Sequence, residues 1–100
     1  MSLALRRSLA ARRDLLEIWL SIATDDMLAA DRHLDRIEEA ITGLAEFPFL
    51  GAAPPELGEG MRAVLRTPFL IVYRANEGQG EVEIVRIVDA RRNLSILFHQ

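Results

Sequence analysis

The sequence predicts an α+β domain in which an N-terminal strand and a helical hairpin pack on an antiparallel β-meander. Two observations support this fold class. Apolar residues recur at helical spacing between residues 15 and 44, whereas residues 61–88 contain three apolar runs rich in β-branched residues. Residues 48–60, which separate these regions, hold three of the four prolines and three of the six glycines. Neither region is large enough to bury a core alone, so we expect one domain over residues 1–100.

The first half of the chain is predicted to be mainly helical. Residues 3–9 are too few to assign and fit either an edge strand or the start of a helix. Apolar residues at i, i+3, i+4 and i+7 then predict a helix with one apolar stripe. The stripe consists of Leu15, Ile18, Trp19 and Ile22. Asp14 lies mainly off that stripe, so we expect it on the helix surface beside arginine neighbours.

A second helix follows the joint at residues 24–26, whose threonine and aspartates suit a helix N-terminus. The joint is short, which predicts an antiparallel hairpin. Apolar residues of the second helix are spaced to form one continuous seam for packing. The seam consists of Met27, Ala30, Leu34, Ile37, Ile41 and Leu44. Pro48 ends the helix.

Three strands are predicted in the second half. Residues 61–66 alternate in character, which places Arg62 and Arg66 on one face. Residues 69–75 are almost continuously apolar, as in a central strand that is covered on both faces. Residues 81–88 form the third strand, after a glycine-containing hairpin turn.

Composition excludes several kinds of chemistry. The chain has no cysteine, which removes disulfides, thiolate nucleophiles and cysteine-ligated metals. All 12 basic residues are arginine, so no lysine is present for Schiff-base or general-base chemistry. His33 and His99 are far apart in the sequence, and neither belongs to a motif typical of a triad or a metal site. No cofactor or metal is therefore expected.

Charge and hydropathy indicate the environment of the chain. A formal net charge of -3 argues against sequence-specific nucleic-acid binding. No apolar run approaches the 18 residues of a membrane span, and the first residues lack the apolar region of a secretory signal. We therefore expect a soluble, cytoplasmic protein with no membrane partner.

Arginines are the chemically distinctive residues of the predicted sheet and its end. They are Arg62, Arg66, Arg74, Arg86, Arg91 and Arg92. If several share a face, their planar guanidinium groups suit the binding of carboxylates or phosphates. The alternative is that each pairs with a nearby acid, such as Glu81 or Glu83 across the hairpin. The residues alone leave both interpretations open.

Short motifs occur in a fixed order along almost the whole chain. They are ARRDLLEIW at 11–19, AA at 29–30, LAEFP at 44–48 followed by Gly51, GMR at 60–62, IVYR at 71–74, and VEIVRIV at 82–88 followed by Arg91, Arg92 and Asn93. Together they resemble the ParE branch of the ParE/RelE toxin family, whose members are also labelled plasmid stabilisation proteins. One departure is Asp89–Ala90, where ParE-like sequences commonly have His-Gly. An acid at this position would lower the positive charge of the adjacent arginines.

The resemblance implies the toxin of a type II toxin–antitoxin pair, neutralised by the C-terminal segment of a ParD-like antitoxin. ParE members inhibit DNA gyrase, whereas RelE members cleave mRNA in the ribosome with basic residues and often a C-terminal tyrosine. This chain has no lysine, no tyrosine near its end, and Leu70 where RelE-type members carry a catalytic arginine. These differences favour the ParE branch, which acts by binding and not by catalysis. The alternatives are a RelE-like endonuclease that uses Arg62, Arg66 and Arg91, and a non-toxic homologue that only binds antitoxin.

Two sets of candidate site residues follow from the resemblance and from the residue types. The candidates for target binding are Arg62, Arg66, Arg86, Arg91 and Arg92. For the antitoxin, we expect an apolar groove between the helical hairpin and the sheet, with arginine at its rim. The aromatic anchors expected for this contact are Trp19, Tyr73 and Phe98. The tail at residues 89–100 fits either a short strand or a helical turn.

Overall fold

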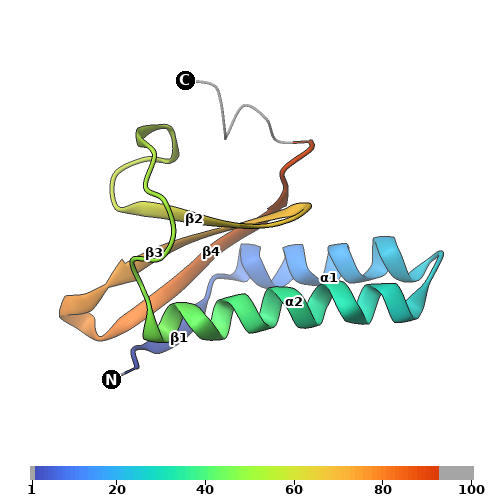
Figure 1. Cartoon of the computed structure of the whole chain (residues 1–100), viewed down its shortest axis with the longest axis horizontal. Coiled ribbons are helices and arrows are strands. Elements are labelled where there is room, and N and C mark those ends of the chain that lie inside the picture. Colours follow the sequence, from blue (N-terminus) through green and yellow to red (C-terminus); the bar gives the residue numbers. More distant parts are fainter. Residues whose placement is uncertain (1, 93–100) are drawn as a thin grey trace.

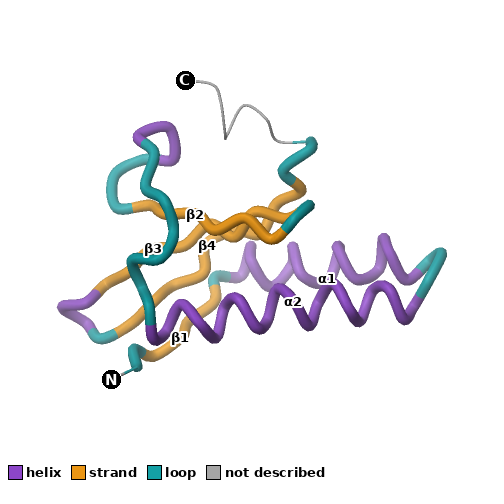
Figure 2. The backbone as a smooth tube through the Cα atoms, viewed as in Figure 1, coloured by secondary structure: helices purple, strands orange, loops and turns teal. Residues whose placement is uncertain are grey.

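The computed structural model describes residues 2–92, which form two layers (Figure 1). One layer is a four-stranded sheet, and the other is a pair of antiparallel helices that covers one face of the sheet and extends beyond it (Figures 1 and 2). The strands are β1 (Ala4–Arg7), β2 (Met61–Arg66), β3 (Phe69–Asn76) and β4 (Glu81–Asp89), and the helices are α1 (Leu9–Ala23) and α2 (Met27–Glu46). The predicted α+β class and helical hairpin are confirmed.

Both helices begin at residues whose side chains cap them. Ser8 Oγ accepts a backbone N–H at 2.9 Å at the start of α1, and Asp26 Oδ1 accepts one at 3.0 Å at the start of α2. Only residues 24–26 separate the helices, so the chain must reverse direction there. Ser8 Oγ also donates a hydrogen bond to the carbonyl of Val85 at 2.7 Å, which fixes the entry to α1 against β4.

The strand order in the sheet is β1-β4-β3-β2. Strands β2, β3 and β4 form the predicted antiparallel meander, and β1 adds to it in parallel with β4. The ambiguous N-terminal segment is therefore a strand. β1 pairs with β4 only from Glu81 to Ile84, so the rest of that edge of β4 has no neighbouring strand within the described residues.

A β-bulge changes which side chains of β4 face the helices. Val85 is left unpaired where the register between β3 and β4 shifts. Ile84 and Ile87 consequently both join the core beneath the helices. Arg86 lies opposite Val72 and shares its face, which points away from the helices. In an unbroken strand, Arg86 and Ile84 would lie on the same face.

The main core lies between the helices and the sheet. Its buried members are Ala11, Leu15, Ile37, Ala40, Ile41, Leu44, Val64, Phe69, Ile71, Tyr73, Val82, Ile84 and Ile87. The Tyr73 hydroxyl donates to the carbonyl of Pro48 and accepts the N–H of Gly51, both at 2.8 Å. A Cβ at Gly51 would lie 2.8 Å from that hydroxyl and 2.7 Å from the carbonyl of Ala63, so only glycine fits. These contacts anchor the loop after α2 to the sheet.

A second apolar cluster covers the opposite face of the sheet. It consists of Leu70, Val72, Val88 and Ala90, with Met61 and Ala63 half-buried beside them. The first five residues of β3 are therefore buried in succession, which confirms the prediction of a central strand covered on both faces. No described helix combines the length and apolar character needed to cross a bilayer.

Candidate functional site

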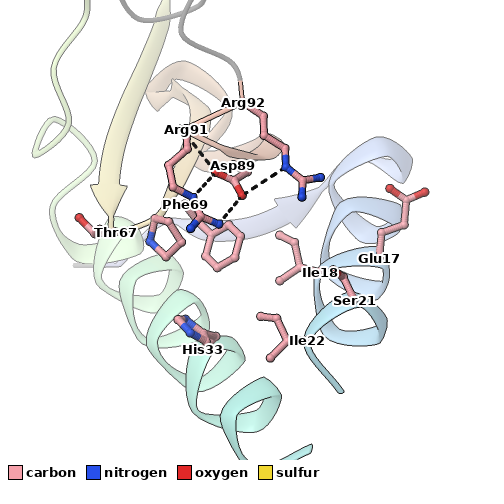
Figure 3. Close-up of a pocket in the computed structure, with 11 residues that line it drawn as sticks. Glu17, Ile18, Ser21, Ile22, His33, Thr67, Phe69, Asp89, Arg91 and Arg92 are labelled. Atoms are coloured by element: carbon pink, nitrogen blue, oxygen red, sulfur yellow. Dashed lines mark hydrogen bonds and ion pairs between the residues drawn. The ribbon is translucent and has the colours of Figure 1, made fainter. Parts of the chain in front are cut away.

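A groove of about 590 Å³ lies where the helical hairpin meets the end of the sheet (Figure 3). Ile18 and Ile22 point into it from α1. The turn between β2 and β3 and the first residue of β3, Phe69, form the opposite wall, and α2 contributes His33. The end of β4 and the residues after it supply the rim. The structure thus contains the kind of groove that the sequence predicts.

The floor of the groove is apolar. Ile18 and Ile22 are one helical turn apart, and both are partly buried against the main core. The His33 ring meets the buried ring of Phe69 edge-on, with centroids 5.7 Å apart and an interplanar angle of 88°. A partner's apolar side chains would be removed from water on this surface, which is worth about 25 cal/mol for each Å² buried.

The rim of the groove carries two arginines that differ in how firmly they are held (Figure 3). Arg91 donates to the Asp89 carboxylate from its backbone N–H at 2.9 Å, from Nε at 3.0 Å and from Nη2 at 2.8 Å. The hydrogen bond from the Arg91 side chain is the largest cause that lowers the pKa of Asp89 below its ordinary value. Arg92 reaches Asp89 only at 4.0 Å, and its side chain is 82% exposed. Arg92 is therefore the cation of the rim that is more available to a partner.

Each arginine of the sheet is engaged with its own neighbours. Arg62 donates to the carbonyl of Gly51 at 2.8 Å, and its guanidinium lies 4.8 Å above the Phe49 ring. Arg66 donates to the carbonyl of Leu65 at 2.9 Å. The alternative that these arginines pair with nearby acids is met across the hairpin by Arg74 and Glu83, whose contact of 3.9 Å is long and weak. Of the six arginines named from the sequence, two thus contact carbonyl groups, whereas Arg74, Arg86, Arg91 and Arg92 lie beside acids.

The sheet arginines do not gather on one face, which corrects the interpretation of a shared basic surface. Arg62 and Arg66 alternate with Met61, Ala63 and Leu65 and share the face of Val64, which packs beneath the helices. Arg74 contacts Met61 on the opposite face. Arg86 also lies there because of the bulge in β4.

Asp14 is buried, so its predicted place on the surface of α1 is wrong. Its carboxylate accepts two hydrogen bonds from Arg86, at 2.7 Å and 2.9 Å, and one from the backbone N–H of Ile87 at 2.9 Å. The strand β1 ends before this point, so Asp14 occupies the open edge of β4. A signal was present in the sequence, because Asp14 stands three residues after Ala11 and four before Ile18, within the apolar face.

The three aromatic candidates for antitoxin binding lie in different places. Tyr73 is fully buried and hydrogen-bonded inside the core, so it is not a surface anchor, which corrects that candidate. Trp19 is partly buried outside the groove, and its indole N–H donates to Asp31 of α2 at 2.9 Å. Phe98 and Asn93 lie outside the described residues, as does most of the tail.

The groove offers apolar surface and guanidinium groups. Within residues 2–92, no three histidine, aspartate or glutamate side chains come together in a way that would hold a metal ion. The polar side chains that line the groove are Glu17, Ser21, His33, Thr67, Asp89, Arg91 and Arg92. An apolar floor with cations at its rim is suited to binding a protein segment that has apolar and acidic side chains.

The family model described as the ParE toxin of the type II toxin–antitoxin system parDE matches residues 5–94. This match covers almost the whole chain. The chain belongs to the ParE toxin family. Several of the motif residues on which the family resemblance rests make contacts that stabilise the fold. Asp14 pairs with Arg86, and Gly51 packs on Tyr73.

Individual relatives agree with the ParE assignment. Toxin ParE3 of Caulobacter vibrioides is 39% identical over 66 residues, a match that covers 66% of this chain and 64% of that protein. The chain thus matches less than two thirds of the length of this relative. The chromosomal ParDE system of P. aeruginosa contains a chain of similar fold, with a TM-score of 0.74 and 24% identity over 88% of this chain and 96% of that one.

A second solved structure also has a similar fold. A chain of the toxin–antitoxin complex RelBE2 from Mycobacterium tuberculosis has a TM-score of 0.70 and 22% identity, over 89% of this chain and 99% of that chain. At these identities the two structures establish the fold. The predicted ParE/RelE-like arrangement of strand, helical hairpin and meander is confirmed.

Proposed function

We propose that this chain is a toxin that inhibits DNA gyrase by binding, and that a ParD-like antitoxin neutralises it. Membership of the ParE toxin family and the similarity to Toxin ParE3 support the first part. We place the protein in the cytoplasm, where DNA gyrase and the antitoxin act. No catalytic residue and no cofactor is assigned to this function.

The antitoxin is proposed to bind in the groove, and the geometry of the groove is the observation that supports this proposal. Ile18, Ile22 and Phe69 provide an apolar floor, and Arg92 stands exposed at the rim. A short segment with apolar side chains and one acid complements such a surface. Burial of the apolar side chains would supply most of the affinity, and the acid opposite Arg92 would fix the orientation.

The contacts of the arginines favour binding to a target over cleavage of RNA. A ribosomal nuclease needs cations that stabilise a phosphoryl transition state. Of the three arginines that a RelE-like mechanism would use here, Arg62 is hydrogen-bonded to loop carbonyls and Arg91 is paired with Asp89. Arg66 lies on β2, and Leu70 occupies the position of the RelE arginine. No lysine is present to replace them.

The same rim is proposed to serve target and antitoxin. An antitoxin in the groove covers Arg92, so the target loses access to that cation while the antitoxin is bound. Neutralisation then follows from competition for one surface, without any change of shape in the toxin.

Expression of the chain alone, and together with the protein encoded by the adjacent reading frame, tests this function. We expect the chain alone to stop growth, to induce the DNA-damage response and to leave mRNA intact, and we expect the adjacent protein to restore growth. The purified chain should also inhibit supercoiling by gyrase. Cleavage of mRNA at ribosomal A sites would contradict the gyrase proposal, and harmless expression of folded protein would contradict toxicity.

A further inference from the structure

The outward face of α1 carries three exposed leucines that belong neither to the core nor to the groove. Leu9, Leu16 and Leu20 are 61%, 59% and 52% exposed. Their spacing of seven and four residues places them in one line along the helix, over about 16 Å. We refer to them as the α1 stripe. A surface helix normally turns a polar side to water, so aligned leucines indicate a surface that another molecule covers.

Two residues of opposite charge, Arg13 and Glu17, lie on one flank of the α1 stripe. They are about one helical turn apart, on the side of α1 away from Trp19, whose indole N–H is hydrogen-bonded to α2. Both side chains are exposed. Among the described residues, neither has an oppositely charged group within 4.0 Å. The α1 stripe is therefore bordered by one free cation and one free anion of residues 2–92.

Glu17 stands at the border between the α1 stripe and the groove. It lines the groove, but its carboxylate is turned away from Ile18 and Ile22 (Figure 3). The hydrogen bond to Asp14 is the largest cause of the raised pKa of Arg86, and the charge of Glu17 adds a smaller contribution. Because the hydrogen bonds of Arg86 go to Asp14, the carboxylate of Glu17 is available to a second molecule.

The charges beside the α1 stripe are complementary to those of a second copy of this chain. A symmetric dimer with antiparallel α1 helices brings the same flank of both copies together. With the two-fold axis at the level of Leu15, Arg13 of one copy lies level with Glu17 of the other, and the reverse. The two Arg12 side chains, on the other flank, are then about 9 Å apart along the helix axis and do not face each other. Two ion pairs form, and no like charges meet on these flanks.

The leucines meet in the same arrangement. Leu9 of one copy comes within about 1.5 Å of the level of Leu20 of the other, and the two Leu16 residues are about 3 Å apart along the helix axis. The α1 stripe thus packs on itself from end to end. We expect a contact below the standard size of about 800 Å² for each copy, and therefore a weak dimer that dissociates on dilution.

A second copy satisfies both charges of the flank at once. A partner with only acidic side chains at its edge would leave Glu17 beside a like charge, and a partner with only basic ones would do the same to Arg13. The α1 surface itself presents both signs at the spacing that pairs them. Symmetric pairs of identical chains are also the commonest kind of soluble oligomer.

We propose that this chain, when no other protein covers α1, forms a symmetric dimer through the α1 stripe, with Arg13 of each copy paired with Glu17 of the other. Ile18 and Ile22, which form the floor of the groove, lie on the opposite side of α1 (Figure 3). Both grooves therefore remain open in the dimer. The dimer does not depend on the function proposed above, and its presence or absence leaves that function intact.

Sedimentation equilibrium of the full chain alone, over about 1 μM to 1 mM, tests the dimer. The average mass should rise with concentration from 11.2 kDa, the mass of one chain, towards twice that value. Leu16→Glu places two acids at the centre of the contact and should weaken the dimer at least about tenfold. Leu65→Glu, at a leucine of β2 that is 51% exposed, is the control and should change it less than about twofold. Circular dichroism checks that both variants fold.

An exchange of charges tests the pairing across the two-fold axis. Arg13→Glu and Glu17→Arg should each weaken self-association at least about tenfold at low salt, because like charges then face each other. When the two variants are mixed in equal amounts, every pair again has opposite charges. The mixture should therefore form a mixed dimer with an affinity within about threefold of wild type. One variant carries a fluorescent label, so that the mixed dimer is observed directly.

Three results would overturn the proposal. The first is a wild-type chain that keeps the mass of a single chain over the whole range of concentration. The second is a dimer that Leu16→Glu and Leu65→Glu weaken equally, since its interface would then lie elsewhere on the molecule. The third is a mixture of Arg13→Glu and Glu17→Arg that stays monomeric, which would contradict the antiparallel pairing of the two α1 helices.

Discussion

Asp14 of α1 holds Arg86 of β4 through two hydrogen bonds, at 2.7 Å from Nε and 2.9 Å from Nη2. The same carboxylate accepts the backbone N–H of Ile87 at 2.9 Å. Asp14 thus occupies the edge of β4 where β1 has ended, and it fastens the helical layer to the sheet. Arg86 was a candidate for target binding, and in the structure its guanidinium is paired with Asp14.

Replacement of Asp14 by alanine is expected to destabilise the fold. The Ile87 N–H would lose its partner at a buried position, and Arg86 would lose its counter-ion. We expect a loss of about 2–4 kcal/mol in the free energy of unfolding, measured by urea denaturation. Asp35→Ala, at an exposed position of α2, is the control and should change stability by less than about 0.5 kcal/mol. Equal stability of the two variants would show that the pair contributes little.

Removal of the Tyr73 hydroxyl is expected to weaken the attachment of the loop after α2. Tyr73→Phe keeps the ring in the core but leaves the N–H of Gly51 and the carbonyl of Pro48 without their partner. The expected cost is about 1–3 kcal/mol in the same measurement. Gly51→Ala should be at least as damaging, because its Cβ has no room against Tyr73 and Ala63. Unchanged stability of both variants would contradict the described contact.

Glu38 gives the stability of the protein a predictable dependence on pH. The hydrogen bond from Arg7 is the largest cause that lowers the pKa of Glu38 below its ordinary value. A carboxylate with a lower pKa in the folded state stabilises the fold above its unfolded pKa, and this contribution is lost as the pH falls through the folded pKa. Because both side chains are partly exposed, we expect Glu38→Gln to cost only about 0.5 kcal/mol at pH 7. The difference between wild type and variant should disappear as the pH falls below the lowered pKa of Glu38, and a difference that grows on acidification would contradict this account.

Asp89 is expected to restrain the positive charge of the groove rim. Asp89→Asn removes the negative charge beside Arg91 and Arg92 without changing the size of the side chain. Under the proposed function, an acidic antitoxin segment should then bind about two- to tenfold more tightly at low salt. The advantage should vanish at about 1 M salt, where charges are screened over about 3 Å. Weaker binding by the variant at low salt would contradict this role of Asp89.

The sequence predicted most elements of the fold because their periodicities are long and regular. The seam of α2 and the apolar run of β3 both lie where the spacing placed them. β1 was ambiguous because its four residues are too few to show a period, and parallel pairing with β4 joins segments far apart in the chain.

The side-chain arrangement was less predictable, because it depends on contacts between elements. The bulge at Val85 puts Arg86 on the face opposite Ile84, although simple alternation places them together. Asp14 was assigned to the surface because its partner, Arg86, is 72 residues away in the sequence. The groove was predicted in outline, with arginine at its rim, but the contrast between Arg91 and Arg92 became visible only in the structure.

The proposal that the antitoxin binds in the groove is tested most directly by two charge reversals compared in one titration. Arg92→Glu inverts the exposed cation of the rim, and Arg36→Glu inverts an exposed arginine of α2 that does not line the groove. With the protein of the adjacent reading frame as ligand, Arg92→Glu should lower the affinity at least about tenfold, and Arg36→Glu should leave it within about twofold of wild type. Equal affinities of the two variants would contradict the placement of the antitoxin in this groove.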